Sequence, residues 1–140
     1  MSTTTPLTLT ELQARCYSQA ADKGFHDYRP ENDRADLSYL MEKLTLIHGE
    51  VSEAAEELRK GHPVDLNYYP ADANDTTAPL YREPGTGGGG KPEGFPAELA
   101  DVLIRILDLA GARDIDIEAA VIEKLDYNAT RSRMHGGRKA

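Results

Sequence analysis

One segment of the chain, from about Arg34 to Lys60, carries an unbroken helical repeat of apolar residues. These residues recur at steps of three and four, the spacing of one face of an α-helix. They are Leu37, Leu40, Met41, Leu44, Ile47, Val51, Ala54, Ala55 and Leu58. Asp33 or Asp36 can cap the start of this helix, and Gly61 can end it. A helix this long must pack its apolar stripe against other elements, so the segment favours a helical fold.

Three further segments show the same periodicity. They run from about Thr8 to Lys23, from Glu93 or Pro96 to Ala110, and from Ile117 to Arg133. No segment has the alternating apolar pattern of a β-strand. We therefore predict an all-α fold, arranged like a four-helix bundle, within a single domain over residues 1–140.

The segment from about residue 62 to residue 96 differs from the rest of the chain. It contains most of the prolines and the run Gly87–Gly90. Proline is too restricted and glycine too free for regular structure, so we expect an irregular insertion or a flexible loop. A phosphate-binding role for the glycine run is disfavoured, because no Lys-Ser/Thr pair follows it.

Composition narrows the class of protein. The 140 residues are 39% hydrophobic and 29% charged, and no apolar run approaches the length needed to cross a bilayer. We expect no membrane segment and no signal peptide. The single cysteine, Cys16, excludes an internal disulfide and suggests a reducing, cytoplasmic location. The net charge of −8 disfavours nucleic-acid binding but suits divalent cations, which can recruit a phosphate-bearing ligand.

Two pairs of acidic residues are the strongest candidates for chemistry. Glu50 and Glu53 lie three residues apart in one predicted helix, and Glu98 and Asp101 repeat this spacing in the next. Residues three apart share a helix face, and each pair borders the apolar stripe. If the two helices pack through their stripes, four carboxylates converge, and such hard oxygen ligands fit Mg²⁺ or Mn²⁺. The alternative is that both pairs are solvated surface charges.

The last predicted helix carries a polar set at steps of four and three, namely Lys124, Asn128 and Arg131. They share one face. The two cations there could bind phosphate oxygens, while the asparagine could position a phosphate, a sugar or a metal ligand. The alternative is again a solvated charged face. The four histidines have no metal-binding spacing, and we assign none of them a catalytic role.

Taken in order, the segments Leu46–Gly61, Glu98–Leu107 and Glu123–Arg131 resemble the MazG-like nucleotide pyrophosphohydrolases, an all-α superfamily. This resemblance implies that Glu50, Glu53, Glu98 and Asp101 bind Mg²⁺, with Mn²⁺ as a possible substitute, and that Glu50 or Glu53 orients the attacking water as a base. It implies that Lys124, Asn128 and Arg131 bind the substrate. The reaction would convert a ribo- or deoxyribonucleoside triphosphate and water into the monophosphate and pyrophosphate. The fold would be a MazG-type bundle whose core is completed in a homodimer or homotetramer.

Two departures and three alternatives accompany this resemblance. Gly49 stands where the family often has a further glutamate, and the segment between the two acidic pairs is longer than usual. A related activity on dUTP, dCTP or phosphoribosyl-ATP is one alternative. A non-catalytic helical module that binds metal or a basic partner is another. The third is nucleic-acid binding through Arg131, Arg133, Arg138 and Lys139, which the net charge disfavours.

Overall fold

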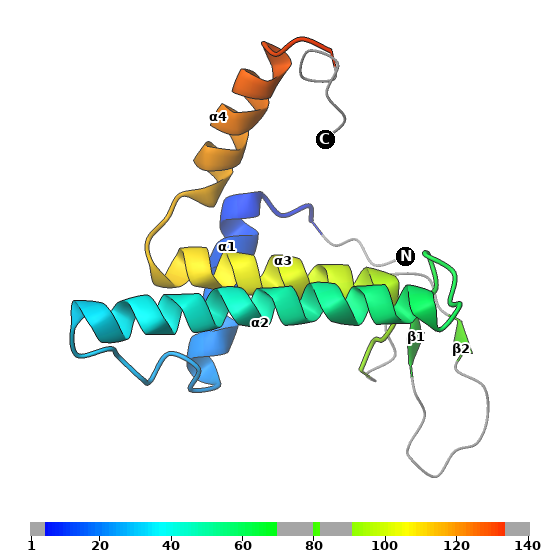
Figure 1. Ribbon diagram of the computed structural model, residues 1–140, viewed down its shortest axis with the longest axis horizontal. Coiled ribbons are helices and arrows are strands. Elements are labelled where there is room, and N and C mark those ends of the chain that lie inside the picture. Colours follow the sequence, from blue (N-terminus) through cyan, green and yellow to red (C-terminus); the bar gives the residue numbers. More distant parts are fainter. Residues whose placement is uncertain (1–4, 70–79, 82–90, 134–140) are drawn as a thin grey trace. The chain divides into compact units, whose positions relative to one another are not determined.

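The computed structural model describes residues 5–69, 80–81 and 91–133. Within these residues the fold is all-α, as predicted, with two very short strands (Figure 1). The helices are α1 (Leu9–Asp22), α2 (Asp33–Arg59), α3 (Phe95–Ala112) and α4 (Ile117–Ala129). Each lies within a few residues of its predicted range, although α4 ends four residues earlier than expected.

The helix starts follow ordinary capping chemistry. The Thr8 hydroxyl accepts a hydrogen bond from the Glu11 backbone, while the Glu11 carboxylate accepts one from the Thr8 backbone. Asp116 caps α4, where its side chain accepts a hydrogen bond from the Ala119 backbone. The cap of α2 was predicted wrongly, because it is Asn32 that accepts a hydrogen bond from the Ala35 backbone. Asparagine and aspartate cap helices about equally well, so residue type alone could not decide between these neighbours.

The chain divides into two compact units. The first unit comprises residues 1–26 and 107–140, and within its described part α1 packs against α4. The Thr10 hydroxyl donates a hydrogen bond to Glu118 (2.6 Å), and the Gln13 side-chain amide donates one to the Ile115 carbonyl (2.8 Å). Leu107 and Ala110, near the C-terminal end of α3, are its buried apolar residues.

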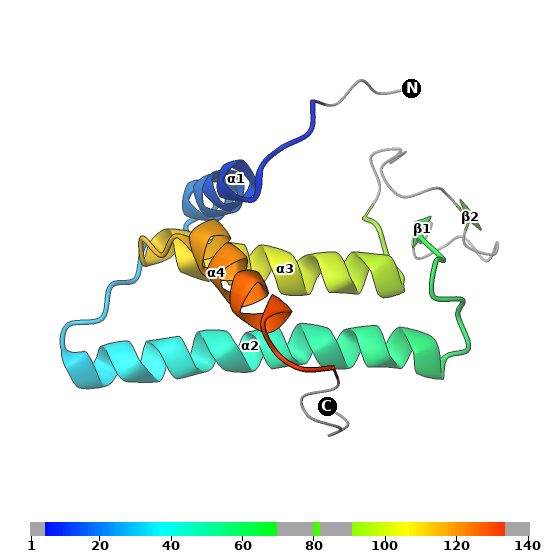
Figure 2. The ribbon, with the colours of Figure 1, turned by 90° about the horizontal axis from the view of Figure 1, so that it is seen from above.

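The second unit, residues 27–106, contains α2 and most of α3. These two helices run alongside each other in opposite directions (Figure 2). Beyond α2, the strand β1 (Tyr68–Tyr69) pairs antiparallel with β2 (Leu80–Tyr81), and Tyr68 also bridges to Glu93. The prediction of a wholly irregular insertion therefore missed a short β-ladder. Its strands have only two residues each, which is too short to show an alternating pattern in the sequence. The Gly87–Gly90 run lies outside the described residues.

The apolar stripe of α2 does not all face α3. We call the inner face of α2 the set of residues least exposed to solvent: Asp36, Leu40, Lys43, Ile47, Glu50, Ala54 and Glu57. The outer face consists of the residue that follows each of these in the sequence. All of its members are exposed: Leu37, Met41, Leu44, His48, Val51, Ala55 and Leu58. The more apolar face of α2 is thus the exposed one, whereas the inner face carries two buried glutamates.

Candidate metal centre

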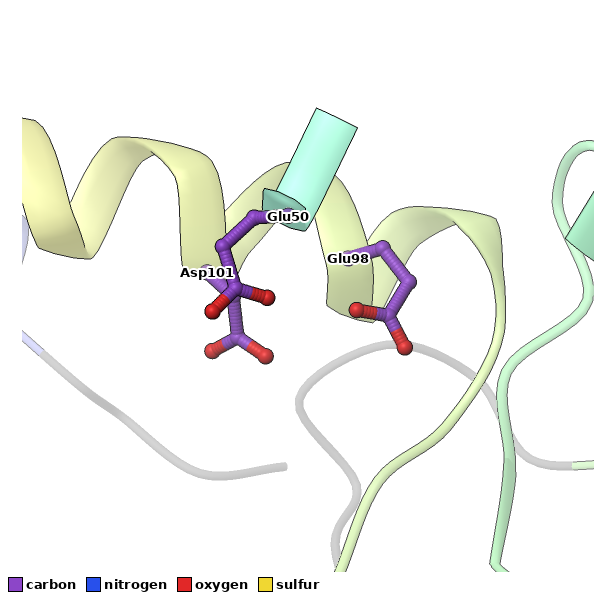
Figure 3. Close-up of side chains that lie close together, drawn as sticks. All are labelled: Glu50, Glu98 and Asp101. Carbon is purple, nitrogen blue, oxygen red and sulfur yellow. The ribbon is translucent and has the colours of Figure 1, made fainter. Parts of the chain in front are cut away.

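Three of the four predicted carboxylates converge in the second unit. Glu50 of α2 and both Glu98 and Asp101 of α3 each offer an oxygen within 4.8 Å of the other two. Figure 3 shows the three carboxylates on the same side of α3. Glu50 and Glu98 are only 9% and 6% exposed, and Asp101 is more exposed than either. Glu50 and Glu98 are therefore part of the interior, whereas Asp101 remains accessible to solvent.

Local helix geometry explains this convergence. Glu98 and Asp101 are separated by three residues at the start of α3, so they share a face one turn apart. Glu98 lies in the first turn, where the free N–H groups favour a negative side chain. The antiparallel course of α2 then brings Glu50, on its inner face, opposite this turn.

An arginine that the sequence analysis did not single out balances part of this charge. The Arg105 side chain donates a hydrogen bond through Nε to Oε1 of Glu50. Arg105 is one helical turn beyond Asp101, and this spacing of opposite charges was the available signal. With one oxygen of Glu50 held by the guanidinium, the site keeps more carboxylate charge than the arginine can neutralise.

Glu53, the fourth predicted carboxylate, is not part of this group of three but contacts one of its members, Glu98. The Glu53 side chain is exposed and shares a hydrogen bond with the carboxyl group of Glu98. A hydrogen bond between two carboxyl groups requires that one of them carries a proton. Burial, followed by this contact with Glu53, raises the pKa of Glu98 to about 7. Burial and the nearby Glu50 also raise the pKa of Asp101, against the opposing effect of Arg105.

The donor set fits a divalent cation. Oε2 of Glu98 is buried and has no hydrogen-bond partner among the described residues. Leaving a buried carboxylate oxygen without a partner is costly, and the raised pKa values express the same lack of positive charge. Carboxylate oxygens are the ligands that Mg²⁺ and Mn²⁺ prefer, so a bound cation would compensate all of these groups together.

A second acidic group adjoins the first at the far end of α2. Glu57, Glu93 and Glu98 each offer an oxygen within 4.8 Å of the others. The Tyr68 hydroxyl donates to both oxygens of Glu57 (2.9 and 3.1 Å), and His62 Nδ1 lies 2.6 Å from Glu57 Oε2. Burial and the Glu57 contact raise the pKa of Tyr68 to about 12. Burial alone would raise the pKa of Glu57, but the His62 and Tyr68 hydrogen bonds lower it overall.

The predicted substrate-binding residues lie in the first unit. Lys124 and Asn128 belong to α4, and Arg131 follows its end. All three are exposed, and both cations approach the ring of Tyr127, with Lys124 Nζ at 5.8 Å and the Arg131 guanidinium carbon at 6.0 Å from its centroid. The two cations thus lie on one side of α4, as expected. They share the ring of Tyr127, which the sequence analysis had not noted.

Two histidines have partners that their sequence positions do not indicate. In the first unit, His26 Nε2 lies 2.6 Å from Asp108 Oδ1, and its ring packs against Tyr17 with centroids 4.9 Å apart. In the second, His62 contacts Glu57 as described. The contact of His26 joins residues far apart in the sequence, so only the fold brings them together, whereas that of His62 is local to the end of α2.

Comparison with known proteins identifies no relative of this chain. No family model, curated protein or solved structure matches this chain. Among the described residues, no helix combines the length and apolar character required to cross a membrane.

Proposed function

We propose that this protein is a Mg²⁺-dependent, MazG-like pyrophosphohydrolase that converts a nucleoside triphosphate into the monophosphate and pyrophosphate. The observation that carries the proposal is the convergence of two buried carboxylates, Glu50 and Glu98, with the more exposed Asp101, while one oxygen of Glu98 lacks a partner among the described residues. Two buried carboxylates beside a third are destabilising unless a cation compensates their charge. A cation held by carboxylates alone keeps ligand positions open for phosphate oxygens.

Each site residue has a distinct part in this reaction. Glu50, Glu98 and Asp101 would hold the Mg²⁺, which neutralises charge on the phosphates when bound. Glu53 is exposed yet tied to the site through Glu98, whereas Glu50 is occupied by Arg105. Glu53 is therefore the better placed of the two candidate bases. It would accept a proton from water as the water attacks phosphorus and the bond between the α- and β-phosphates breaks.

The polar set on α4 would bind the triphosphate. Lys124 and Arg131 supply two cations on one side of an exposed helix, and Asn128 lies between them in sequence. Two cationic side chains can bind the oxygens of a triphosphate, and the neighbouring amide can hydrogen-bond a phosphate or the sugar. Replacement of Lys124 by glutamine should therefore raise KM for the triphosphate more than it lowers kcat.

A second copy of the chain would cover the outer face of α2. Within the described residues only four hydrophobic residues are buried, which is few for a folded segment of this length, namely Ala54, Tyr68, Leu107 and Ala110. The outer face repeats at steps of four and three over three turns and more, and Leu37, Met41 and Val51 are 61%, 56% and 51% exposed. Such a repeat is self-complementary about a two-fold axis, which favours a homodimer or a homotetramer built from it.

The oligomeric state tests this face directly. Leu44→Glu places a charge at its centre, and we expect light scattering to report a smaller assembly than for the unchanged protein. Glu56→Gln, an exposed change on the same helix, should leave the mass unaltered. A monomeric unchanged protein would refute the proposed assembly without bearing on the metal site.

The decisive test of the activity is pyrophosphate release. A panel of ribo- and deoxyribonucleoside triphosphates would be assayed with Mg²⁺ and with EDTA. We expect metal-dependent release that Glu53→Gln abolishes and Glu56→Gln retains, because only Glu53 contacts Glu98. The panel also ranks dUTP and dCTP against the other substrates.

A negative panel has two different meanings. Turnover of phosphoribosyl-ATP alone would keep the reaction but change the substrate. Tight Mn²⁺ binding with no turnover of any nucleotide would contradict the enzyme and favour a non-catalytic metal-binding module.

A further inference from the structure

Arg105 holds one of the two oxygens of Glu50. Its side chain donates a hydrogen bond through Nε to Oε1, and Glu50 is its one ion-pair partner among the described residues. The Glu50 side chain is only 11% exposed, so water competes weakly for this hydrogen bond to a charged group. Oε2 is therefore the oxygen of Glu50 that remains open to a cation.

Glu98 also has one oxygen without a partner. Its Oε2 is buried and accepts no hydrogen bond from the described residues, whereas Glu53 contacts its carboxyl group. The two buried carboxylates of the site thus present one open oxygen each. The ligand positions that they leave on a bound ion fall to water or to phosphate oxygens.

The backbone before α3 keeps Glu98 in place. The Tyr68 N–H donates to the Glu93 carbonyl (3.0 Å), and the Glu93 N–H donates to the Tyr68 carbonyl (2.8 Å). The next residue, Gly94, has φ of +117°, and a Cβ there would collide with the Leu66 carbonyl oxygen. The Glu98 N–H in turn donates to the Gly94 carbonyl (3.0 Å). These main-chain contacts oppose the shift that a larger ion would need in order to gain ligands.

We propose that Arg105 is a positioning residue that limits Glu50 to one-oxygen coordination, and that the site thereby selects Mg²⁺ or Mn²⁺ over Ca²⁺. Ca²⁺ takes about six to eight oxygen ligands and often binds both oxygens of a carboxylate, whereas Mg²⁺ requires octahedral geometry and keeps several waters. A carboxylate with one oxygen already held suits the smaller ion. The proposal rests on the proposed function for the presence of a divalent ion, and not for turnover.

Two neutral replacements of Arg105 isolate the hydrogen bond from the positive charge. In Arg105→Gln the side-chain amide nitrogen stands as many bonds from the backbone as Nε, so a donor for Glu50 is retained. Arg105→Met has a stem of similar length and no donor. Because both variants lack the charge, the difference between them reports the hydrogen bond alone. Arg59→Met, which replaces an exposed arginine paired with Glu56, is the matched control.

Competition for Mn²⁺ on the full chain measures the selectivity without reference to turnover. Electron paramagnetic resonance counts the free Mn²⁺ that Mg²⁺ or Ca²⁺ releases, and the two titrations give the ratio of the Ca²⁺ and Mg²⁺ dissociation constants. This ratio should fall at least about tenfold in Arg105→Met, the effect of one hydrogen bond to a charged group. It should be retained in Arg105→Gln and in Arg59→Met. Infrared spectra of Ca²⁺-loaded Arg105→Met should show the two carboxylate stretches moving closer together, the signature of two-oxygen coordination.

Taking the ratio within each variant guards against a folding defect, because a loss of stability weakens the binding of both ions alike. Equal ratios in Arg105→Met and Arg105→Gln would overturn the role of Arg105, as would an unchanged protein that binds Ca²⁺ as tightly as Mg²⁺. Either result, with Mg²⁺-dependent pyrophosphate release intact, leaves the proposed function standing. The expected ratios without turnover of any nucleotide would do the reverse. An unchanged protein that binds no Mn²⁺ would refute both.

Discussion

Replacing Glu98 by glutamine should stabilise the metal-free protein above neutral pH. In the folded protein the pKa of Glu98 is about 7, against an ordinary value of 4.5. Between these values the folded protein holds a proton that the unfolded chain has released. The free energy of unfolding therefore falls as pH rises through this interval, and below pH 4.5 no such loss occurs.

The size of the effect follows from the same two values. The interval between 4.5 and about 7, at about 1.4 kcal/mol for each pH unit, amounts to a loss of about 3 kcal/mol. This is an upper figure, because Glu53 shares the proton with Glu98. Glutamine carries no charge at any pH, so the variant should escape the loss. For a chain of this length the difference corresponds to a melting temperature about 10 °C higher at pH 8.

Thermal melts in EDTA at pH 4.5, 6 and 8 measure this directly. The melting temperature of the unchanged protein should fall from pH 4.5 to pH 8. That of Glu98→Gln should change little over this range, because the variant lacks the group that titrates. Adding Mg²⁺ at pH 8 should restore the unchanged protein and have little effect on the variant, since the cation replaces the missing compensation. Glu56→Gln should behave as the unchanged protein. A variant destabilised equally at all three pH values would refute the electrostatic reasoning.

Three further outcomes follow from the described contacts. Mn²⁺ affinity should weaken about tenfold for each pH unit below 7, because the ion must displace the proton on Glu98; calorimetry showing no pH dependence would contradict this. Tyr68→Phe should lower the free energy of unfolding in urea by about 1.5–3 kcal/mol, through loss of the hydrogen bond to Glu57. Gly111→Ala should destabilise, because its Cβ would lie 2.8 Å from that of Tyr17 and overpacking costs about 1–3 kcal/mol, whereas Gly49→Ala, with nothing within 4 Å, should stabilise by about 1 kcal/mol. Equal effects of the two alanines in the same melts would show that packing at Gly111 is looser than described.

The sequence predicts the helices of this fold better than their orientation. Apolar spacing located all four helices because each repeats over three turns or more. It did not identify which side of α2 faces α3, because the apolar positions span both Leu40 on the inner face and Met41 on the outer face. A stripe this wide is compatible with several rotations of the helix, and only packing against α3 selects one.

The site was predicted to a similar degree. Spacing alone brought Glu50, Glu98 and Asp101 together as expected, since each pair is local and the two helices are antiparallel neighbours. Arg105, Tyr68 and Glu93 were missed. The spacing of Arg105 from Asp101 was an available signal, but the contacts of Tyr68 and Glu93 depend on the return of the chain after α2, and no periodic signal describes that return. Arg138, Lys139 and His135 lie outside the described residues, so the alternative that rests on the basic tail stays a prediction.

The close approach at Gly94 has a consequence at the level of the gene. Every missense change of a glycine codon adds at least a Cβ, and at this position any Cβ meets the Leu66 carbonyl oxygen while φ is +117°. Codon 94 is therefore expected to tolerate no amino-acid replacement, and this intolerance comes from main-chain geometry rather than from any chemistry of a side chain. In a saturation mutagenesis library selected for folded protein, it should stand out as depleted of every variant, even though glycine itself contributes no functional group.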